Sequence, residues 1–299
     1  MRILVTGKQG QIARSLAALA SEELSVTTLG RPDLDITDAD SITRSIEGAR
    51  PDILVNPAAY TAVDKAESEA QAAFAVNRDG ARNAAAAAAA AGLPVIHVST
   101  DYVFAGDKPA PYVETDATGP TGIYGGSKLE GEQAVAAANA AHVILRTAWV
   151  YSPYGHNFLK TMLRLAGERD TVRVVADQFG APTYAPDIAE GILVVARAAL
   201  AEPQAETWRG VFHMTAAGET TWAGFAEAIF AESGARGGPS ARVEPITTAE
   251  YPTPARRPAN SRLDHSKFRT TFNHALPNWR GRVRQCVAEL TMHHASEIR

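Results

Sequence analysis

The chain has 299 residues, of which 45% are hydrophobic and 21% charged, and its formal net charge is −4. This balance is that of an ordinary globular protein and excludes the disordered and fibrous classes. A slightly acidic chain offers no overall attraction to nucleic acid or to an anionic membrane, and no apolar run approaches the length of a membrane span. The single cysteine, Cys286, cannot form an internal disulfide, so we expect a reducing compartment and a cytoplasmic protein.

The first half of the chain alternates β-rich runs with helical stretches. The runs predicted as strands are residues 2–6, 25–29, 53–56, 95–99 and 142–146. The stretches predicted as helices are residues 11–20, 38–48, 67–91 and 128–141. Such alternation predicts an α/β fold of the Rossmann type, in which a doubly wound parallel sheet carries helices on both faces.

After residue 146 the alternation is interrupted by prolines and glycines, among them Pro153, Gly155 and Pro182. We therefore predict a dinucleotide-binding domain over residues 1–150 and, over residues 151–299, mainly a smaller substrate-binding lobe. One segment of the lobe could return to the edge of the sheet. Ligands of such a fold bind beyond the carboxyl ends of the strands.

The first predicted strand leads directly into the sequence TGKQGQIA. Gly7 allows a tight backbone turn there, and Gly10 lets a pyrophosphate approach the start of the following helix, where free N–H groups favour an anion. The pattern alone is weak, because a glycine turn can be purely structural. Its place between a strand and a helix favours a dinucleotide site.

The second predicted strand ends in the sequence LGR. An NAD-specific Rossmann unit usually carries an acidic residue at this point, whereas a guanidinium suits the 2′-phosphate of NADPH. Arg31 therefore favours NADPH, with NADH as the alternative cofactor; a solvated surface arginine is the structural alternative. Asp35 and Ile36 would border the adenine, unless they form only a capping loop before Asp38.

A tyrosine and a lysine, Tyr124 and Lys128, stand four residues apart in the segment YGGSK. On a helix they lie on one face, and an ammonium beside a phenol stabilises the phenolate and lowers its pKa. Tyr124 could then donate a proton to a carbonyl oxygen as hydride reaches the carbon. Thr100, at the end of the fourth predicted strand, is placed to hydrogen-bond the same oxygen. A surface Tyr–Lys pair is the alternative, and the glycine turn together with Thr100 favours a reductase.

Longer motifs cover nearly the whole chain. They are GKQGQIA, LDITD, VNPAAYTAVDKAE, STDYVF, YGGSKLEGE, RTAWVY, GHNFLKTML, DQFGAPTYA and RPANSRLDHSKF. In these motifs the chain resembles the extended short-chain dehydrogenase/reductases and, among them, the dTDP-4-dehydrorhamnose reductases. The resemblance implies NADPH- or NADH-dependent reduction of the C4 ketone of dTDP-4-dehydro-L-rhamnose to dTDP-L-rhamnose, a step that supplies polysaccharide synthesis.

The same resemblance implies roles for individual residues. Tyr124 would be the general acid, Lys128 would lower its pKa and bind the ribose, and Thr100 would orient the carbonyl. The residues implied for the rest of the cofactor site are Gly10, Gln11, Ile12, Asp35, Ile36, Ala58, Ala59, Tyr60 and Thr61. Those implied for the substrate are Thr100, Asp101, Trp149, Arg257 and Asn260, the last two at the diphosphate. Without the family motif, Trp149 could be a core aromatic and Arg257 a solvated loop charge.

The chain departs from the family pattern next to the glycine turn. Ala13 replaces a usual glycine, and Arg14 and Ser15 stand where some bacterial members use a glutamate to bind Mg²⁺ at a dimer interface. We therefore predict no required metal and leave monomer and homodimer open. His293 and His294 are interpreted as surface residues of the C-terminal tail.

Two other functions remain open at this point. A related extended reductase or epimerase acting on another nucleotide sugar would use the same proton donor and differ in the lobe after residue 150. A non-catalytic subunit, like the regulatory partner of methionine adenosyltransferase, would share the fold. The presence of Tyr124, Lys128 and Thr100 argues against the second alternative.

Overall fold

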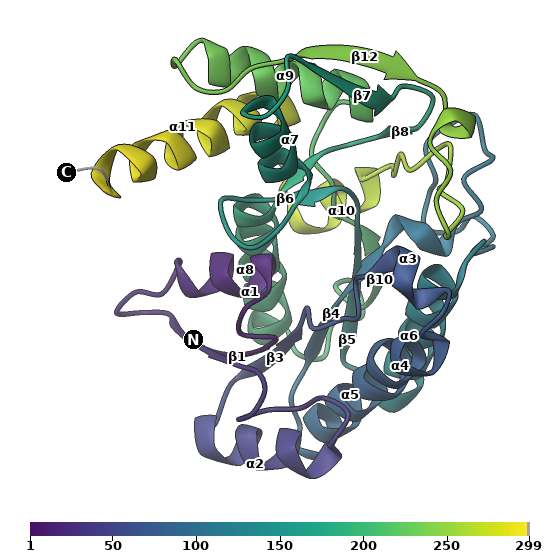
Figure 1. Cartoon of the computed structure of the whole chain (residues 1–299). Helices are drawn as coiled ribbons and strands as arrows, with labels where there is room; N and C mark the ends of the chain where they lie inside the picture. The colour runs from purple at the N-terminus through teal and green to yellow at the C-terminus, as the bar shows by residue number, and fades with distance from the viewer. Residues whose placement is uncertain (298–299) are drawn as a thin grey trace.

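A parallel sheet of six strands forms the centre of the molecule, in the order β10-β5-β4-β3-β1-β2 (Figure 1). The computed structural model describes the backbone of residues 1–297 and the side chains of residues 1–291, so His293 and His294 lie outside the described side chains. The strands are β1 (Arg2–Thr6), β2 (Ser25–Leu29), β3 (Ile53–Asn56), β4 (Val95–Thr100), β5 (His142–Thr147) and β10 (Gly210–His213). The winding direction reverses between β1 and β3, the kind of point at which such sheets bind ligands.

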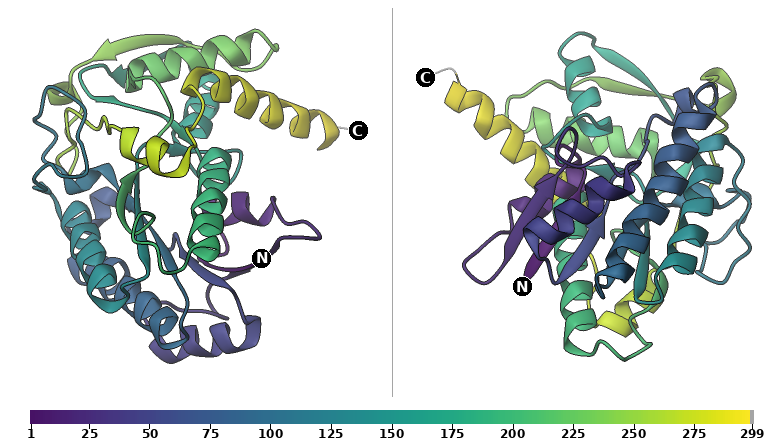
Figure 2. Two further views of the ribbon diagram at one scale, coloured as in Figure 1. Left: turned by 180° about the vertical axis from the view of Figure 1, so that it is seen from behind. Right: turned by 90° about the horizontal axis from the view of Figure 1, so that it is seen from below.

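Helices cover both faces of this sheet, as Figures 1 and 2 show. One face carries α1 (Gln11–Ala17), α8 (Ala185–Ala201) and α10 (Ser266–Phe272); the other carries α2 (Ala39–Ala49), α5 (Ala81–Ala90) and α6 (Ile123–Ala138). The strand residues alternate between the two layers: Ile3 and Val5 belong to the first core and Leu4 to the second. The predicted Rossmann-type doubly wound fold is confirmed.

The helix predicted over residues 67–91 is divided. The structure has α3 (Val63–Ala66) and α4 (Ala70–Phe74), then a π-helical turn, η1 (Ala75–Gly80), which runs directly into α5. The helix predicted from residue 128 begins earlier, at Ile123. Tyr124 and Lys128 consequently lie on the same helix, α6.

A lobe with its own core lies above the sheet in Figure 1. It contains α7 (Phe158–Ala166), α9 (Trp222–Gly234) and α11 (Trp279–Glu297), with β7 (Thr171–Val175) paired to β12 (Arg242–Ile246). Its remaining strands form two short pairs, β6 (Val150–Tyr151) with β9 (Thr183–Tyr184) and β8 (Phe179–Gly180) with β11 (Thr220–Thr221). Two short 3-10 turns, η2 (Asp101–Val103) and η3 (Thr248–Glu250), complete the described elements.

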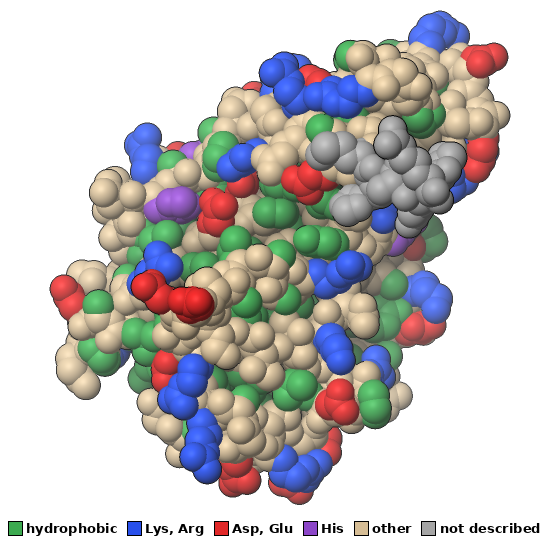
Figure 3. Space-filling view, turned by 90° about the vertical axis from the view of Figure 1, so that its left-hand side faces the viewer, with side chains coloured by type: hydrophobic (Ala, Val, Ile, Leu, Met, Phe, Trp, Pro, Cys, Tyr) green, Lys and Arg blue, Asp and Glu red, His purple; other side chains and the backbone are tan. Residues whose placement is uncertain are grey.

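The surface carries both signs of charge. On the face drawn in Figure 3, basic and acidic side chains are interspersed. None of the helices in the described part of the chain combines the length and the apolar character needed to cross a bilayer.

Candidate functional site

A cleft of about 810 Å³ opens where the carboxyl ends of the sheet strands meet the lobe. Most of the residues predicted from the sequence line it: Gly7, Gly10, Gln11, Ile12, Arg31, Asp35, Ile36, Ala58, Ala59, Thr61, Thr100, Asp101, Tyr124, Lys128 and Trp149. Three predicted residues, Tyr60, Arg257 and Asn260, are absent from its walls. The strand ends thus bring together groups that are up to 142 positions apart in the sequence, from Gly7 to Trp149.

The glycine turn at one end of the cleft has the geometry that a dinucleotide requires. Gly7 has φ +83°, in the left-handed region, and a Cβ there would lie 3.3 Å from Ala58 of the loop after β3. The N–H of Gly10 donates to the Gly7 carbonyl, 2.9 Å away, and no side chain caps the start of α1. Backbone amide groups without side-chain partners therefore stand at the cleft wall, where they fit the phosphates of a dinucleotide.

The side chain of Gln11 makes three hydrogen bonds that were not predicted from the sequence. Its Oε1 accepts from the Ser152 hydroxyl (2.7 Å) and from Asn157 Nδ2 (3.1 Å), and its Nε2 donates to the Val150 carbonyl (3.3 Å). The side chain therefore ties the glycine turn to the segment after β6. Ser152 and Asn157 could not be paired with Gln11 from the sequence, because they are about 140 residues away.

Arg31 lies two residues after the end of β2, and its side chain is largely exposed. Its side chain is 80% exposed, and its ion pair with Asp35 is long, at 4.0 Å. The Asp35 carboxylate is occupied mainly by Thr37, since the backbone N–H (2.9 Å) and hydroxyl (2.8 Å) of Thr37 both donate to it. Those hydrogen bonds hold the pKa of Asp35 below its usual value. Arg31 is thus free to meet an anion such as a 2′-phosphate.

Two residues with hydroxyl groups, Thr100 and Tyr124, line the same cleft. Thr100, the last residue of β4, donates to Asp101 Oδ1 at 3.0 Å, and Tyr124 of α6 stands edge-on to Tyr102, with ring centroids 5.4 Å apart. Close approach of α6 depends on Gly125, because a Cβ there would lie 2.2 Å from the Tyr102 carbonyl oxygen. Burial raises the pKa of Tyr124, so its phenol is protonated at neutral pH.

Lys128 is buried on the same helix face, and the partners of its Nζ within the chain lie on β4. Its Nζ donates to the Val98 carbonyl (2.7 Å) and contacts His97 Nε2 (3.2 Å), both on β4. Burial lowers the pKa of Lys128 to about 8. The predicted lowering of the Tyr124 pKa by this ammonium is therefore corrected, because burial of the phenol dominates and raises its pKa.

Asp101 and Trp149 also line the cleft, and Trp149 contacts the lobe. Asp101 is buried, and burial raises its pKa to about 6. Trp149 has φ +50°, an unusual conformation for a bulky residue, and its ring stacks on Trp222 of α9 with centroids 3.6 Å apart. Gly180 makes room for it, since a Cβ at that position would lie 2.4 Å from the Trp149 ring.

Tyr60 and Arg257 lie outside the walls of the cleft. The Tyr60 hydroxyl donates to Glu69 Oε2 at 2.6 Å. The Arg257 guanidinium donates to Asp64 Oδ2 (2.6 Å) and to the hydroxyl of Tyr102 (3.2 Å), itself a cleft residue. In this structure Arg257 therefore supports the wall of the cleft from outside.

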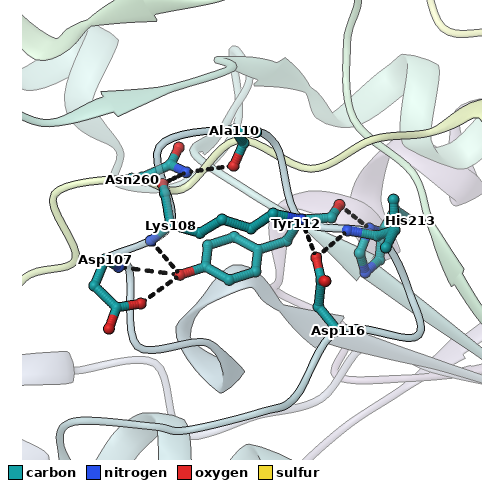
Figure 4. A network of polar contacts seen from close by, with 8 residues as sticks. Asp107, Lys108, Ala110, Tyr112, Asp116, His213 and Asn260 are labelled. Atoms are coloured by element: carbon teal, nitrogen blue, oxygen red, sulfur yellow. Dashed lines mark hydrogen bonds and ion pairs between the residues drawn. The ribbon is translucent and has the colours of Figure 1, made fainter.

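Asn260 is buried in a separate polar network (Figure 4). Its Nδ2 donates to the carbonyls of Lys108 (2.6 Å) and Ala110 (2.9 Å), and its Oδ1 accepts from the backbone N–H of Arg262 (3.0 Å). Both ends of the amide are therefore engaged within the chain. Asn260 was predicted to contact the diphosphate, but in this structure its side chain does not face the cleft.

Arg14 and Ser15, which follow the glycine turn, both have partners within the chain. The Arg14 guanidinium lies over the Tyr154 ring, 4.5 Å from the centroid. Neighbouring Ser15 donates to the Gln11 carbonyl at 2.8 Å. Among the described residues, no group of three or more His, Cys, Asp or Glu side chains is arranged to hold a metal ion.

A Rossmann-type sheet with a glycine turn, a strand-end threonine and a Tyr–Lys pair on one cleft defines an extended short-chain dehydrogenase/reductase. Residues 1–292 match the family model described as RmlD substrate binding domain. The chain is 54% identical to the dTDP-4-dehydrorhamnose reductase of Sinorhizobium fredii (strain NBRC 101917 / NGR234), with 98% of each chain covered. The chain belongs to the dTDP-4-dehydrorhamnose reductase family, as its motifs predicted.

Solved structures agree with this assignment. A dTDP-4-dehydrorhamnose reductase from Clostridium acetobutylicum ATCC 824 superposes with a TM-score of 0.89 at 36% identity, covering 97% of this chain and 100% of that one. The enzyme from Bacillus anthracis str. Ames, solved in complex with NADP, also gives a TM-score of 0.89 at 36% identity, with 96% and 99% covered. The fold is therefore shared over almost the whole length.

Proposed function

We propose that this protein reduces the C4 ketone of dTDP-4-dehydro-L-rhamnose to dTDP-L-rhamnose with NADPH. The observation that carries the proposal is the single cleft that unites the glycine turn with the hydroxyls of Thr100 and Tyr124. Family membership at 54% identity supports the substrate, and the NADP complex of the Bacillus anthracis relative supports the cofactor.

The side chains of the cleft divide the chemistry among them. NADPH, when bound, supplies the hydride. Tyr124, kept as a neutral phenol by burial, donates its proton to the ketone oxygen as the hydride arrives at the carbon. Thr100 hydrogen-bonds the same oxygen and stabilises the charge that develops on it. Lys128 would contact the cofactor ribose, and its ammonium would stabilise the phenolate that Tyr124 becomes after it has given up its proton.

The remaining walls of the cleft would bind the two ligands. The cofactor-binding residues we propose are Gly7, Gly10, Gln11, Ile12, Arg31, Asp35, Ile36, Ala58, Ala59 and Thr61, which line the cleft, and Tyr60, which lies outside its walls. Asp101 and Trp149 would contact the sugar nucleotide. We propose that Arg257 and Asn260 act on the substrate indirectly, through Tyr102 and the loop at Lys108.

We propose that the nucleotide sugar binds against the lobe formed by most of residues 151–299, while residues 1–150 carry the dinucleotide. The protein would work in the cytoplasm, as a monomer or a homodimer, without a required Mg²⁺ and without nucleic acid or membrane as a partner.

A Tyr124→Phe variant tests the proton donor. Loss of the hydroxyl should lower kcat by about 10²- to 10⁴-fold, the range of general acid catalysis, while NADPH affinity stays within about twofold. The assay follows NADPH absorbance with dTDP-4-dehydro-L-rhamnose, and fluorescence titration gives the NADPH affinity. Unchanged turnover would remove Tyr124 from the mechanism.

The same assay separates the alternatives. Inactivity on dTDP-4-dehydro-L-rhamnose beside activity on another keto sugar nucleotide would identify a related reductase or epimerase. Binding of NADPH without turnover of any nucleotide sugar would instead favour a regulatory subunit. The high identity to a dTDP-4-dehydrorhamnose reductase over 98% of both chains favours the first proposal over these two.

A further inference from the structure

A chain of four buried polar side chains leads from Lys128 across the sheet. Lys128 Nζ lies 3.2 Å from His97 Nε2, His97 Nδ1 lies 3.1 Å from Asn56 Nδ2, and Asn56 Oδ1 lies 2.5 Å from the Thr6 hydroxyl. These side chains come from α6, β4, β3 and β1 in turn, and each residue is at most 2% exposed. Only Lys128 reaches the cleft.

The hydrogen-bond requirements of an ammonium decide how the chain can be arranged. A charged Lys128 has three N–H donors: the Val98 carbonyl takes one at 2.7 Å, His97 Nε2 takes a second, and one remains for the cleft. Nε2 must then be the accepting nitrogen, so the ring proton sits on Nδ1 and donates to the amide oxygen of Asn56. The Asn56 amide nitrogen would in turn face Thr6.

A neutral lysine allows the opposite arrangement, because its amine nitrogen has a lone pair that can accept a hydrogen bond. The proton then sits on Nε2 and donates to the amine, Nδ1 accepts from the Asn56 amide nitrogen, and the Thr6 hydroxyl donates to Asn56 Oδ1. This is the order of atoms in the structure. Because the amide oxygen and nitrogen of asparagine have nearly the same shape, both arrangements fit the same space.

We propose that His97 is a positioning residue for Lys128: it holds the lysine Nζ at the cleft, and its ring tautomer follows the charge of that lysine. The imidazole remains neutral throughout, since burial and the neighbouring Lys128 keep the pKa of His97 well below its usual value. The chain ends at Thr6, which is fully buried, so it serves to position the lysine and has no outlet for protons to solvent. The catalytic consequence rests on the proposed reductase function, whereas the tautomer exchange does not.

Histidine tautomers can be read directly by NMR of protein labelled with ¹⁵N at histidine. As pH rises through the lysine pKa of about 8, we expect the His97 proton to move from Nδ1 to Nε2. Glu132 of the same helix acts on Lys128 through its charge and is itself paired to Arg146 of β5, while Tyr124 and Asp101 line the same cleft as Lys128. A Lys128→Met variant tests whether the lysine causes the exchange, because without the amine the His97 tautomer should not change with pH. A single tautomer over pH 6 to 10 in the wild type, or a persistent exchange in Lys128→Met, would overturn the proposal.

Kinetics supply a second readout. His97→Leu removes the acceptor, so kcat/KM for the sugar nucleotide should fall by at least about tenfold and the alkaline limb of its pH profile should move to lower pH. His97→Gln retains an amide that can accept from Nζ and should restore much of the loss. His213→Leu is the matched control, because His213 is a fully buried histidine of the same sheet, on β10; its pH profile should stay that of the wild type. Wild-type behaviour of folded His97→Leu would refute the positioning role, whereas a failure of the reductase function itself would leave the tautomer result intact.

Discussion

At the scale of single residues, the exposure of Arg31 at the cleft leads to a prediction about the choice of cofactor. Its guanidinium is 80% exposed at the cleft and has only a distant carboxylate partner. Arg31→Ala should weaken NADPH binding at least about tenfold, the loss expected for a hydrogen-bonded charge pair, and change NADH binding by less than about twofold. Fluorescence titration with both cofactors measures this.

Arg44→Ala is the control for that experiment, because Arg44 is also an exposed arginine, paired with Asp38 at 3.5 Å, and lies away from the cleft. Its cofactor affinities should equal those of the wild type. Equal weakening of NADPH and NADH by Arg31→Ala would show that Arg31 does not distinguish the 2′-phosphate.

The sequence predicted which side chains gather at the cleft better than it predicted what they touch. Tyr124 and Lys128 share a helix face because of their spacing of four, and Thr100 reaches the cleft because it ends a strand. The contact of Lys128 with His97 depends on α6 packing against β4, which no local pattern contains. Asn260 shows the same limit. The motif that contains it suggested a role for this residue, but its buried hydrogen-bond partners could be seen only in the folded structure.

At the scale of secondary-structure elements, α6 is joined to β5 by a buried ion pair. Arg146 Nε and Nη2 donate to the two carboxylate oxygens of Glu132 at 2.9 and 2.6 Å, and both side chains are at most 5% exposed. Glu132→Gln leaves a buried guanidinium without its counter-charge, so the free energy of unfolding should fall by about 3–5 kcal/mol. Urea denaturation followed by circular dichroism measures the loss.

Two further variants make this measurement specific. Replacing both partners, Glu132→Leu with Arg146→Met, should cost less than the single change, because no unpaired charge remains. Glu168→Gln breaks the exposed pair with Arg164 (2.8 Å) and should cost about 0.5 kcal/mol or less. A loss in Glu132→Gln as small as that in Glu168→Gln would contradict the stabilising role of the buried pair.

Strands were predicted more accurately than helices, and the reason is local. A buried strand is a short apolar run with clear ends, so β1, β2 and β3 have the predicted bounds. The bounds of the helices were harder to predict, because the local amino-acid composition does not mark where they begin and end. The alanine-rich segment concealed the π-helical turn η1, and Gly125 and Gly126, poor helix formers, concealed the start of α6.

At the scale of the whole molecule, buried histidines make stability depend on pH. His213 is fully buried, and burial lowers its pKa to about 3. Between pH 6.5 and 3 the unfolded chain therefore binds a proton at this residue that the folded chain does not. Its contribution is present above pH 6.5 and is lost as pH falls, by about 1.4 kcal/mol per pH unit.

A comparison with His213→Gln isolates this contribution. Asp101 and Asp187, whose pKa values burial raises to about 6, act in the opposite direction but are common to both proteins. The stability difference between wild type and variant should therefore shrink by about 1.4 kcal/mol per pH unit from pH 6.5 to 4.5. Denaturant titrations at several pH values give the difference, and a constant difference would mean that His213 titrates normally in the folded state.

The return of α8 and β10 to the sheet has a consequence for biosynthesis. β10 borders β5, and α8 covers α1, although both elements follow residue 150 in the chain. During translation the first 150 residues would therefore emerge with the β5 border of the sheet unpaired and with α1 alone on one of the sheet faces. The helical layer on that face is completed only when α10, which ends at Phe272, has left the ribosome, so we expect the first 150 residues to reach their final structure together with the rest of the chain.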